Sequence, residues 1–140
     1  MENIIMPRLG KTAKRETVIR GENIFIVIPD TDSGKQFGEA IKEKIKKVAE
    51  SATVTIGNDE TLLKKSGVFI ICGNLTNNDC VKYLYYKSLV ITDLCYPGPG
   101  GYEVRTILNP FGNDKNILFI GFSDEVGFQK GVDVFLKEID

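Results

Sequence analysis

The chain has 140 residues, and 42% of them are hydrophobic, which suits one ordinary globular domain. Its 18 lysines and arginines balance 19 aspartates and glutamates, so the charge indicates neither a nucleic-acid-binding surface nor a polybasic membrane patch. Because histidine is absent, the chain excludes Ser-His-Asp and Cys-His nucleophile pairs, an imidazole base and any zinc site with a histidine ligand.

The three cysteines, Cys72, Cys80 and Cys95, show no C-x-x-C spacing and so predict neither a disulfide framework nor a four-thiolate metal site. No apolar stretch approaches the ~20 residues of a membrane-spanning helix, and residues 1–20 lack the apolar centre of a signal peptide. We therefore expect no bound metal, no membrane span and, if the chain is complete, a cytoplasmic protein.

Strands and helices alternate along the first half of the chain. Residues 23–28 (NIFIVI) are apolar on both faces, which is typical of a strand in the middle of a covered sheet. An amphipathic helix is predicted by apolar residues spaced by four, four and three, namely Phe37, Ile41, Ile45 and Val48. In chain order we expect a mixed extension at 1–22, for which an edge strand is one interpretation, a strand at 23–28, a helix at 33–50, a strand at 53–56, helical turns at 58–65 and a strand at 68–72.

The second half is expected to end in a hairpin and a helix. The densest turn signal in the chain is YPGPGG at 96–101. The loop at 109–115 is too short for a crossover helix, so the strands on either side of it should pair antiparallel. The expected elements are a helix at 77–86, a short strand at 89–91, strands at 102–108 and 117–120 and a helix at 123–139.

These elements predict an α/β fold with a single domain over residues 23–140. The expected architecture is a three-layer sandwich, flavodoxin-like in outline, whose mostly parallel sheet carries one antiparallel hairpin, 102–108 with 117–120. Ligands of such open sheets bind beyond the carboxyl ends of the strands, so the candidate sites are sought in the loops that follow the strands.

The first candidate site follows the first buried strand. Its candidate residues are Asp30, Thr31, Ser33 and Gly34. Thr31, Ser33 and Gly34 resemble the T-x-[ST]-G-x-T phosphate loop of flavodoxins, except that Gln36 stands in place of the last hydroxyl residue. The same stretch can instead cap the helix, because Ser33 and Gln36 make an S-x-x-Q capping box. The sequence favours the cap and leaves a phosphate site as the alternative.

Two further candidate regions lie downstream. Asn74 follows the strand at 68–72, and its side chain can contact a ligand at the sheet edge or simply form a turn. The rigid segment 93–102 (DLCYPGPGGY) carries tyrosines that could stack on a sugar or a flavin, or it could only reverse the chain beside a surface pair of Glu103 with an arginine. The candidate residues of these regions are Gly73, Asn74, Asp93, Tyr96, Tyr102 and Arg105.

Motifs in the chain resemble a known kind of domain. They are GN at 73–74, NN at 77–78, YPGPGGY at 96–102, RTILNPFGN at 105–113 and GFSDEVG at 121–127. Together they resemble a small α/β domain near the N-terminus of large secreted bacterial proteins associated with polysaccharide lyases, such as heparinase II/III-like proteins. A looser similarity is to the α/β domain that precedes the catalytic barrel of some glycoside hydrolases. The resemblance covers about residues 24–139, and 93–127 is its specific part.

The resemblance implies a non-catalytic accessory domain, excised from a longer, secreted or periplasmic carbohydrate-active protein that is itself a polysaccharide lyase or glycoside hydrolase. The implied partners are the remaining domains of that protein and a weakly contacted glycan, with no cofactor and no catalytic residues. The alternative function is a flavodoxin-like flavin or nucleotide binder that uses the loop at 31–34. A third hypothesis is a small hydrolase or lyase without histidine, using Asp30, Asp93, Tyr96 and Arg105.

Overall fold

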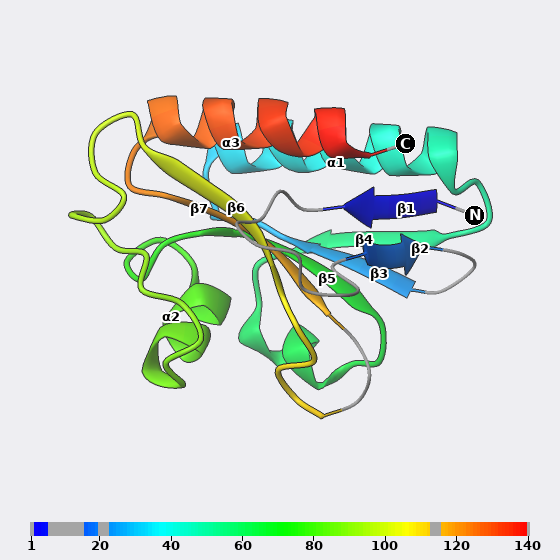
Figure 1. Cartoon of the computed structure of the whole chain (residues 1–140), viewed down its shortest axis with the longest axis horizontal. Helices are drawn as coiled ribbons and strands as arrows, with labels where there is room; N and C mark the ends of the chain where they lie inside the picture. The colour runs from blue at the N-terminus through cyan, green and yellow to red at the C-terminus, as the bar shows by residue number, and fades with distance from the viewer. Residues whose placement is uncertain (1, 6–15, 20–22, 113–115, 140) are drawn as a thin grey trace.

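The computed structural model describes residues 2–5, 16–19, 23–112 and 116–139. A five-stranded sheet lies between two layers of helices, which confirms the predicted α/β sandwich. In Figure 1 the long helices α1 (Asp32–Val48) and α3 (Glu125–Glu138) lie side by side on one face of the sheet. Helix α2 (Asp79–Tyr86) lies on the opposite face, where the short 3₁₀ helix η1 (Glu60–Lys64) packs with it.

The sheet contains strands β3 (Asn23–Val27), β4 (Thr53–Gly57), β5 (Val68–Gly73), β6 (Tyr102–Ile107) and β7 (Ile117–Phe122). Their order is β4-β3-β5-β7-β6, and all pairs are parallel except the last. Strand β6 runs antiparallel to β7, with Tyr102 opposite Phe122 and Ile107 opposite Ile117, so the predicted hairpin is confirmed. Because this hairpin folds back on itself, the strand order is 2-1-3-5-4 in place of the flavodoxin order 2-1-3-4-5.

The three central strands divide their buried side chains between the two faces of the sheet. In β5, Ile70 contributes to the core beneath α1 and α3, and its neighbour Ile71 contributes to the core on the α2 side. Strands β3 and β7 alternate in the same way, which explains why all three read as continuous apolar runs. The phenylalanines of the α2-side core come from these strands and are Phe25, Phe69 and Phe119.

Two predicted helix starts and one predicted strand differ from the structure in ways that the local contacts explain. The first helix begins at Asp32, one residue before the predicted start, because Thr31 is its N-cap. Helix α2 begins at Asp79, two residues after the predicted start, because Asn78 is its N-cap. The short strand predicted at 89–91 is wrong, since this segment joins no sheet and instead buries Val90 in the α2-side core.

The β-prone residues 17–19 lie in β2 (Glu16–Ile19), which pairs antiparallel with β1 (Glu2–Ile5). These two strands form a sheet of their own, separate from the five-stranded sheet. The other residues of the predicted extension, 1, 6–15 and 20–22, lie outside the described residues. In the described part of the chain, no helix combines the length and apolar character needed to cross a membrane.

Candidate functional site

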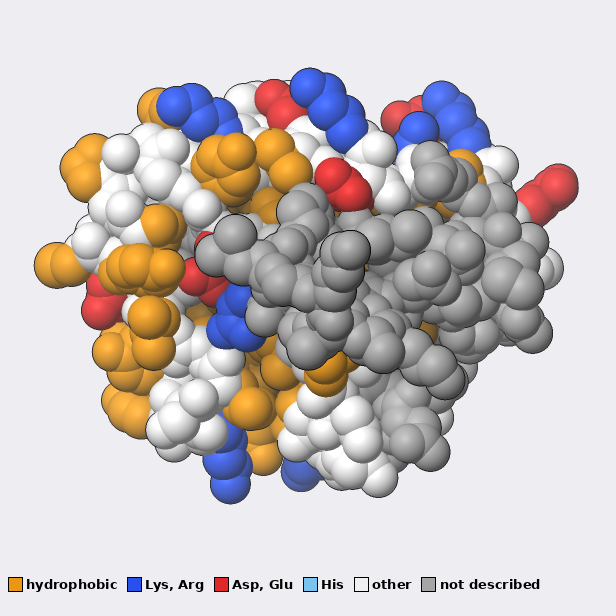
Figure 2. Space-filling model, in the orientation of Figure 1, with side chains coloured by type: hydrophobic (Ala, Val, Ile, Leu, Met, Phe, Trp, Pro, Cys, Tyr) orange, Lys and Arg blue, Asp and Glu red, His pale blue; other side chains and the backbone are white. Residues whose placement is uncertain are grey.

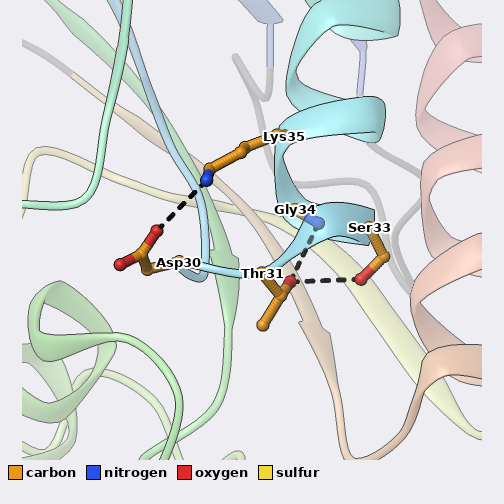
Figure 3. Close-up of polar contacts among 5 residues, drawn as sticks. All are labelled: Asp30, Thr31, Ser33, Gly34 and Lys35. Carbon is orange, nitrogen blue, oxygen red and sulfur yellow. Dashed lines mark hydrogen bonds and ion pairs between the residues drawn. The ribbon is translucent and has the colours of Figure 1, made fainter.

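The junction of β3 and α1 carries the first candidate residues, which Figure 3 shows. The Thr31 Oγ1 atom accepts a hydrogen bond from the Gly34 backbone N–H at 3.0 Å and lies 3.2 Å from the Ser33 hydroxyl. Thr31 therefore caps the helix, and the capping box predicted around Ser33 is wrong. On the other side of the loop, Lys35 Nζ lies 3.7 Å from Asp30 Oδ1 in an exposed ion pair.

The glycine of this loop has a structural reason of its own. A Cβ atom on Gly34 would lie 2.1 Å from the carbonyl oxygen of Pro29, so no larger residue fits where the helix begins against the end of β3. Close backbone packing and an internal cap thus account for the Thr-x-Ser-Gly pattern. This geometry favours the cap interpretation over a phosphate loop.

An open cleft of about 510 Å³ lies at the carboxyl ends of β3, β4 and β5. Its rim is acidic, because Asp30, Asp59, Glu60 and Asp79 all border it. Hydrogen bonds from Thr61 lower the pKa of Asp59, which keeps this side chain charged. An acidic rim opposes binding of a phosphate group at the adjacent helix end. Within the described residues, no three side chains of the metal-ligating types come together to hold an ion.

Gly73 and Asn74 form a buried junction between two strands. The Asn74 side chain is only 1% exposed, and its Nδ2 donates to the Phe122 carbonyl oxygen at 3.0 Å. Its Oδ1 accepts hydrogen bonds from the backbone N–H groups of Thr76 and Asn77 and from the Thr76 hydroxyl. Gly73 has a φ of +147°, a conformation that glycine tolerates best. Asn74 thus ties the end of β5 to the end of β7 and has little capacity left for a ligand.

The segment 93–102 folds into a tight turn that is attached to the start of α3. Asp93 Oδ1 accepts hydrogen bonds at 2.8 Å from the backbone N–H groups of Cys95 and Tyr96, which forms the turn. Ser123 Oγ donates to the Asp93 carbonyl at 2.7 Å and accepts from the Gly98 N–H at 3.0 Å. The Tyr96 side chain remains exposed. The glycines and prolines therefore shape a docked loop and leave this ring in solvent.

Asp124 provides a second attachment between the loop and the helix. Its Oδ1 accepts from the Gly127 N–H at 2.8 Å as the N-cap of α3, and its Oδ2 accepts from the Gly100 N–H at 2.9 Å. These two backbone hydrogen bonds hold the pKa of Asp124 below its ordinary value, and the bond from Gly127 has the larger effect. A Cβ on Gly127 would lie 2.0 Å from the Gly101 carbonyl oxygen, so the loop and the helix approach each other closely.

Arg105 is a structural residue of strand β6. Its Nε donates to Glu103 Oε1 at 2.8 Å, so the predicted pair is confirmed, and its Nη2 donates to the Leu89 carbonyl at 2.6 Å. The guanidinium also lies over the ring of Phe119, with 5.8 Å between Cζ and the ring centre. Arg105 therefore fastens the edge strand to the irregular segment that follows α2.

The four residues of the hydrolase or lyase hypothesis have separate roles in the structure. Asp93 and Tyr96 are neighbours in one turn, whereas Asp30 pairs with Lys35 and Arg105 pairs with Glu103. Tyr102, which the sequence suggested as a ligand-binding residue and not as part of this hypothesis, stands on β6 with an exposed side chain. The geometry therefore gives this hypothesis no assembled catalytic site.

One side of the molecule carries exposed hydrophobic side chains that were not predicted from the sequence. Figure 2 shows exposed hydrophobic side chains at the left of the view, on the side where Figure 1 places α2 and the loop from α2 to β6. Four exposed hydrophobic residues belong to that loop and to the start of α3, and we call them the loop face. They are Ile91, Leu94, Tyr96 and Val126. The signal in the sequence is the apolar loop ITDLCYP at 91–97. The sequence does not show that Val126 lies beside this loop: its Cγ1 would be 3.8 Å from a Cβ atom placed on Gly100.

No family model matches this chain, and no curated protein matches its sequence.

Proposed function

We propose that the chain is a non-catalytic accessory domain of a larger, exported, carbohydrate-active protein, and that the loop face packs against another part of that protein. The observation that carries the proposal is a contrast between two parts of the surface. The polar groups of the strand-end loops are engaged mainly with one another, whereas the loop face leaves four large apolar side chains in solvent. Exposed apolar groups that cluster in this way are typical of contact surfaces.

The loop face suits packing between rigid partners. Ser123 and Asp124 fix the loop against the start of α3, so the apolar side chains need little further ordering when a partner covers them. Interfaces between domains of one chain bury about 600–1,500 Å². The exported, carbohydrate-active setting is supported by the sequence resemblance, of which residues 93–127 are the specific part.

The first experiment measures the length of the native polypeptide. Mass spectrometry of the protein from its own organism would compare peptides from residues 1–140 with peptides that continue beyond Asp140. We expect a product several times larger in the envelope or the medium. A free-standing 140-residue product inside the cell would overturn the proposal, as would a purified protein that carries a bound flavin.

A second experiment tests the loop face directly. Hydrogen exchange would be measured on the isolated chain and on the native polypeptide. We expect the amides of residues 91–96 to be slower in the longer protein, with unchanged exchange on the solvent side of α1 as the control. Equal exchange of 91–96 in both samples would show that the loop face has no partner there.

A further inference from the structure

A groove crosses the outer face of η1 and α2, and its lining shares no residue with the loop face. It consists of two adjoining depressions of about 350 and 470 Å³, and both are bordered by Glu60 and Tyr83. The first extends to Lys64 and Phe111, and the second to Lys82 and Tyr86. We call this feature the tyrosine groove. Its size falls within the ~300–1,000 Å³ of small-molecule sites.

The helix that forms one wall of the groove has an unusual solvent side. Helix α2 buries Cys80, Val81 and Leu84 against the sheet. Its opposite side presents Tyr83, which is 40% exposed, and Tyr86, which is 72% exposed, where charged residues would suffice for solubility. Two exposed aromatic rings on one short helix are a feature that the fold does not require.

The ring of Tyr83 is held in place by its neighbours. Its centre lies 6.3 Å from that of Phe111, with 59° between the ring planes, and the Nζ atom of Lys87 lies 5.6 Å from it. These contacts restrict the ring without covering it. A ligand would therefore meet an aromatic surface that is already oriented.

Charged side chains of both signs border these rings. Within the described residues, the head groups of Glu60, Lys64 and Lys82 make no hydrogen bond or ion pair. Lysine donates hydrogen bonds and a carboxylate accepts them, so the groove offers both functions beside its aromatic surface. A polyanion would favour a uniformly positive groove, and this one is mixed.

We propose that the tyrosine groove binds a neutral oligosaccharide; this inference rests on the proposed function and gives a site to the glycan contact that the sequence resemblance implies. The apolar C–H face of a sugar ring packs on Tyr83, as apolar groups pack on tyrosine generally. Hydroxyl groups at the edge of the sugar donate to Glu60 and accept from Lys64 and Lys82. The residues that line the groove are different from those of the loop face, so one domain can contact a glycan through one set and its own protein through the other.

The test is an NMR titration of the isotope-labelled 140-residue chain with cellohexaose, xylohexaose and mannohexaose. We expect at least one of these sugars to shift the signals of Tyr83, Tyr86 and Phe111. Tyr83→Ala should weaken that binding by roughly tenfold, as loss of a central aromatic contact does. Tyr102→Ala is the matched control, because Tyr102 is 39% exposed but stands on β6, and it should bind as the unaltered chain does.

Lys82→Ala is a second variant, on the exposed side of the same helix, and it should weaken binding without loss of fold. Unchanged binding by both Tyr83→Ala and Lys82→Ala, or equal weakening by Tyr102→Ala, would overturn the site. Binding of a heparin-derived hexasaccharide with no response to the neutral sugars would overturn the ligand class. No response to any sugar would overturn the groove inference, while a long exported polypeptide with a protected loop face would still support the proposed function.

Discussion

Thr31 stabilises the first turn of α1 through one hydroxyl group, which accepts from the Gly34 N–H. Replacing an N-cap threonine with alanine costs about 1 kcal/mol, so Thr31→Ala should lower the free energy of unfolding by about that amount. Ser33 lies inside the helix with a half-buried side chain and is not the N-cap, so Ser33→Ala should change stability by less than about 0.5 kcal/mol. Urea unfolding of both variants at neutral pH measures the difference. A larger loss for Ser33→Ala would contradict the assignment of the cap.

The three cysteines differ sharply in their environments. Cys72 and Cys80 are buried, and burial raises the pKa of each thiol to about 12, whereas Cys95 is exposed. Because the thiolate is the reactive form, a thiol reagent at neutral pH should modify Cys95 alone in the folded protein. All three should react in denaturant. Reaction counted by mass spectrometry checks this, and modification of Cys72 or Cys80 without denaturant would contradict it.

The Asp124 carboxylate accepts hydrogen bonds from both the loop at 93–102 and helix α3. Protonation of this carboxylate should therefore weaken both attachments and lower the stability of the protein. Its pKa is lowered in the folded state, so its contribution to stability is complete above the pKa of the unfolded chain. That contribution is lost as the pH falls through the lower folded-state pKa. We therefore expect part of the acid destabilisation of the protein to disappear in Asp124→Asn.

The measurement is the urea midpoint followed from pH 7 down to about pH 3. Asp133→Asn is the control, because Asp133 lies on the exposed side of the same helix and its carboxylate accepts from the Gln129 side chain. The control should keep the acid sensitivity of the unaltered chain. An Asp124→Asn profile parallel to that of the unaltered chain would exclude this role.

At the level of elements, most strands and helices could be predicted because their signals are local. Residues 23–28 and 68–72 are apolar on both faces, and the structure places both in the centre of the sheet. The failed strand at 89–91 has an equally apolar sequence. There the chain is held by side-chain contacts, Val90 in the core and the Leu89 carbonyl with Arg105, and no periodic pattern encodes such contacts.

The site was harder to predict than the fold for a related reason. Asp30 and Asn74 follow strands β3 and β5, as expected from the sequence. The sequence does not show, however, that the Asn74 side chain donates to the carbonyl of Phe122, a residue on another strand. The tyrosine groove likewise combines Glu60, Tyr83 and Phe111 from three separate segments. A single sequence shows residue types and spacing, and it does not show which polar groups are already engaged.

For the molecule as a whole, strand order predicts how stability is distributed. Strands β3, β5 and β7 each have a neighbour on both sides, while β4 and β6 are the edges of the five-stranded sheet. Amides of the three central strands should exchange only through global unfolding, and those of β4 should exchange faster through local opening. Native-state hydrogen exchange at low denaturant concentrations measures this. Protection of β4 equal to that of β5 would contradict it.

The alternation of side chains along the central strands also limits how the length of this chain can vary. Inserting one residue in β5 would send Phe69 and Ile71 to the face covered by α1 and α3, and would send Ile70 to the other. Both cores would then be filled by side chains of the wrong shape at the same time. Natural variants of this domain should therefore gain or lose residues in the connecting loops, and the spacing within β3, β5 and β7 should stay constant.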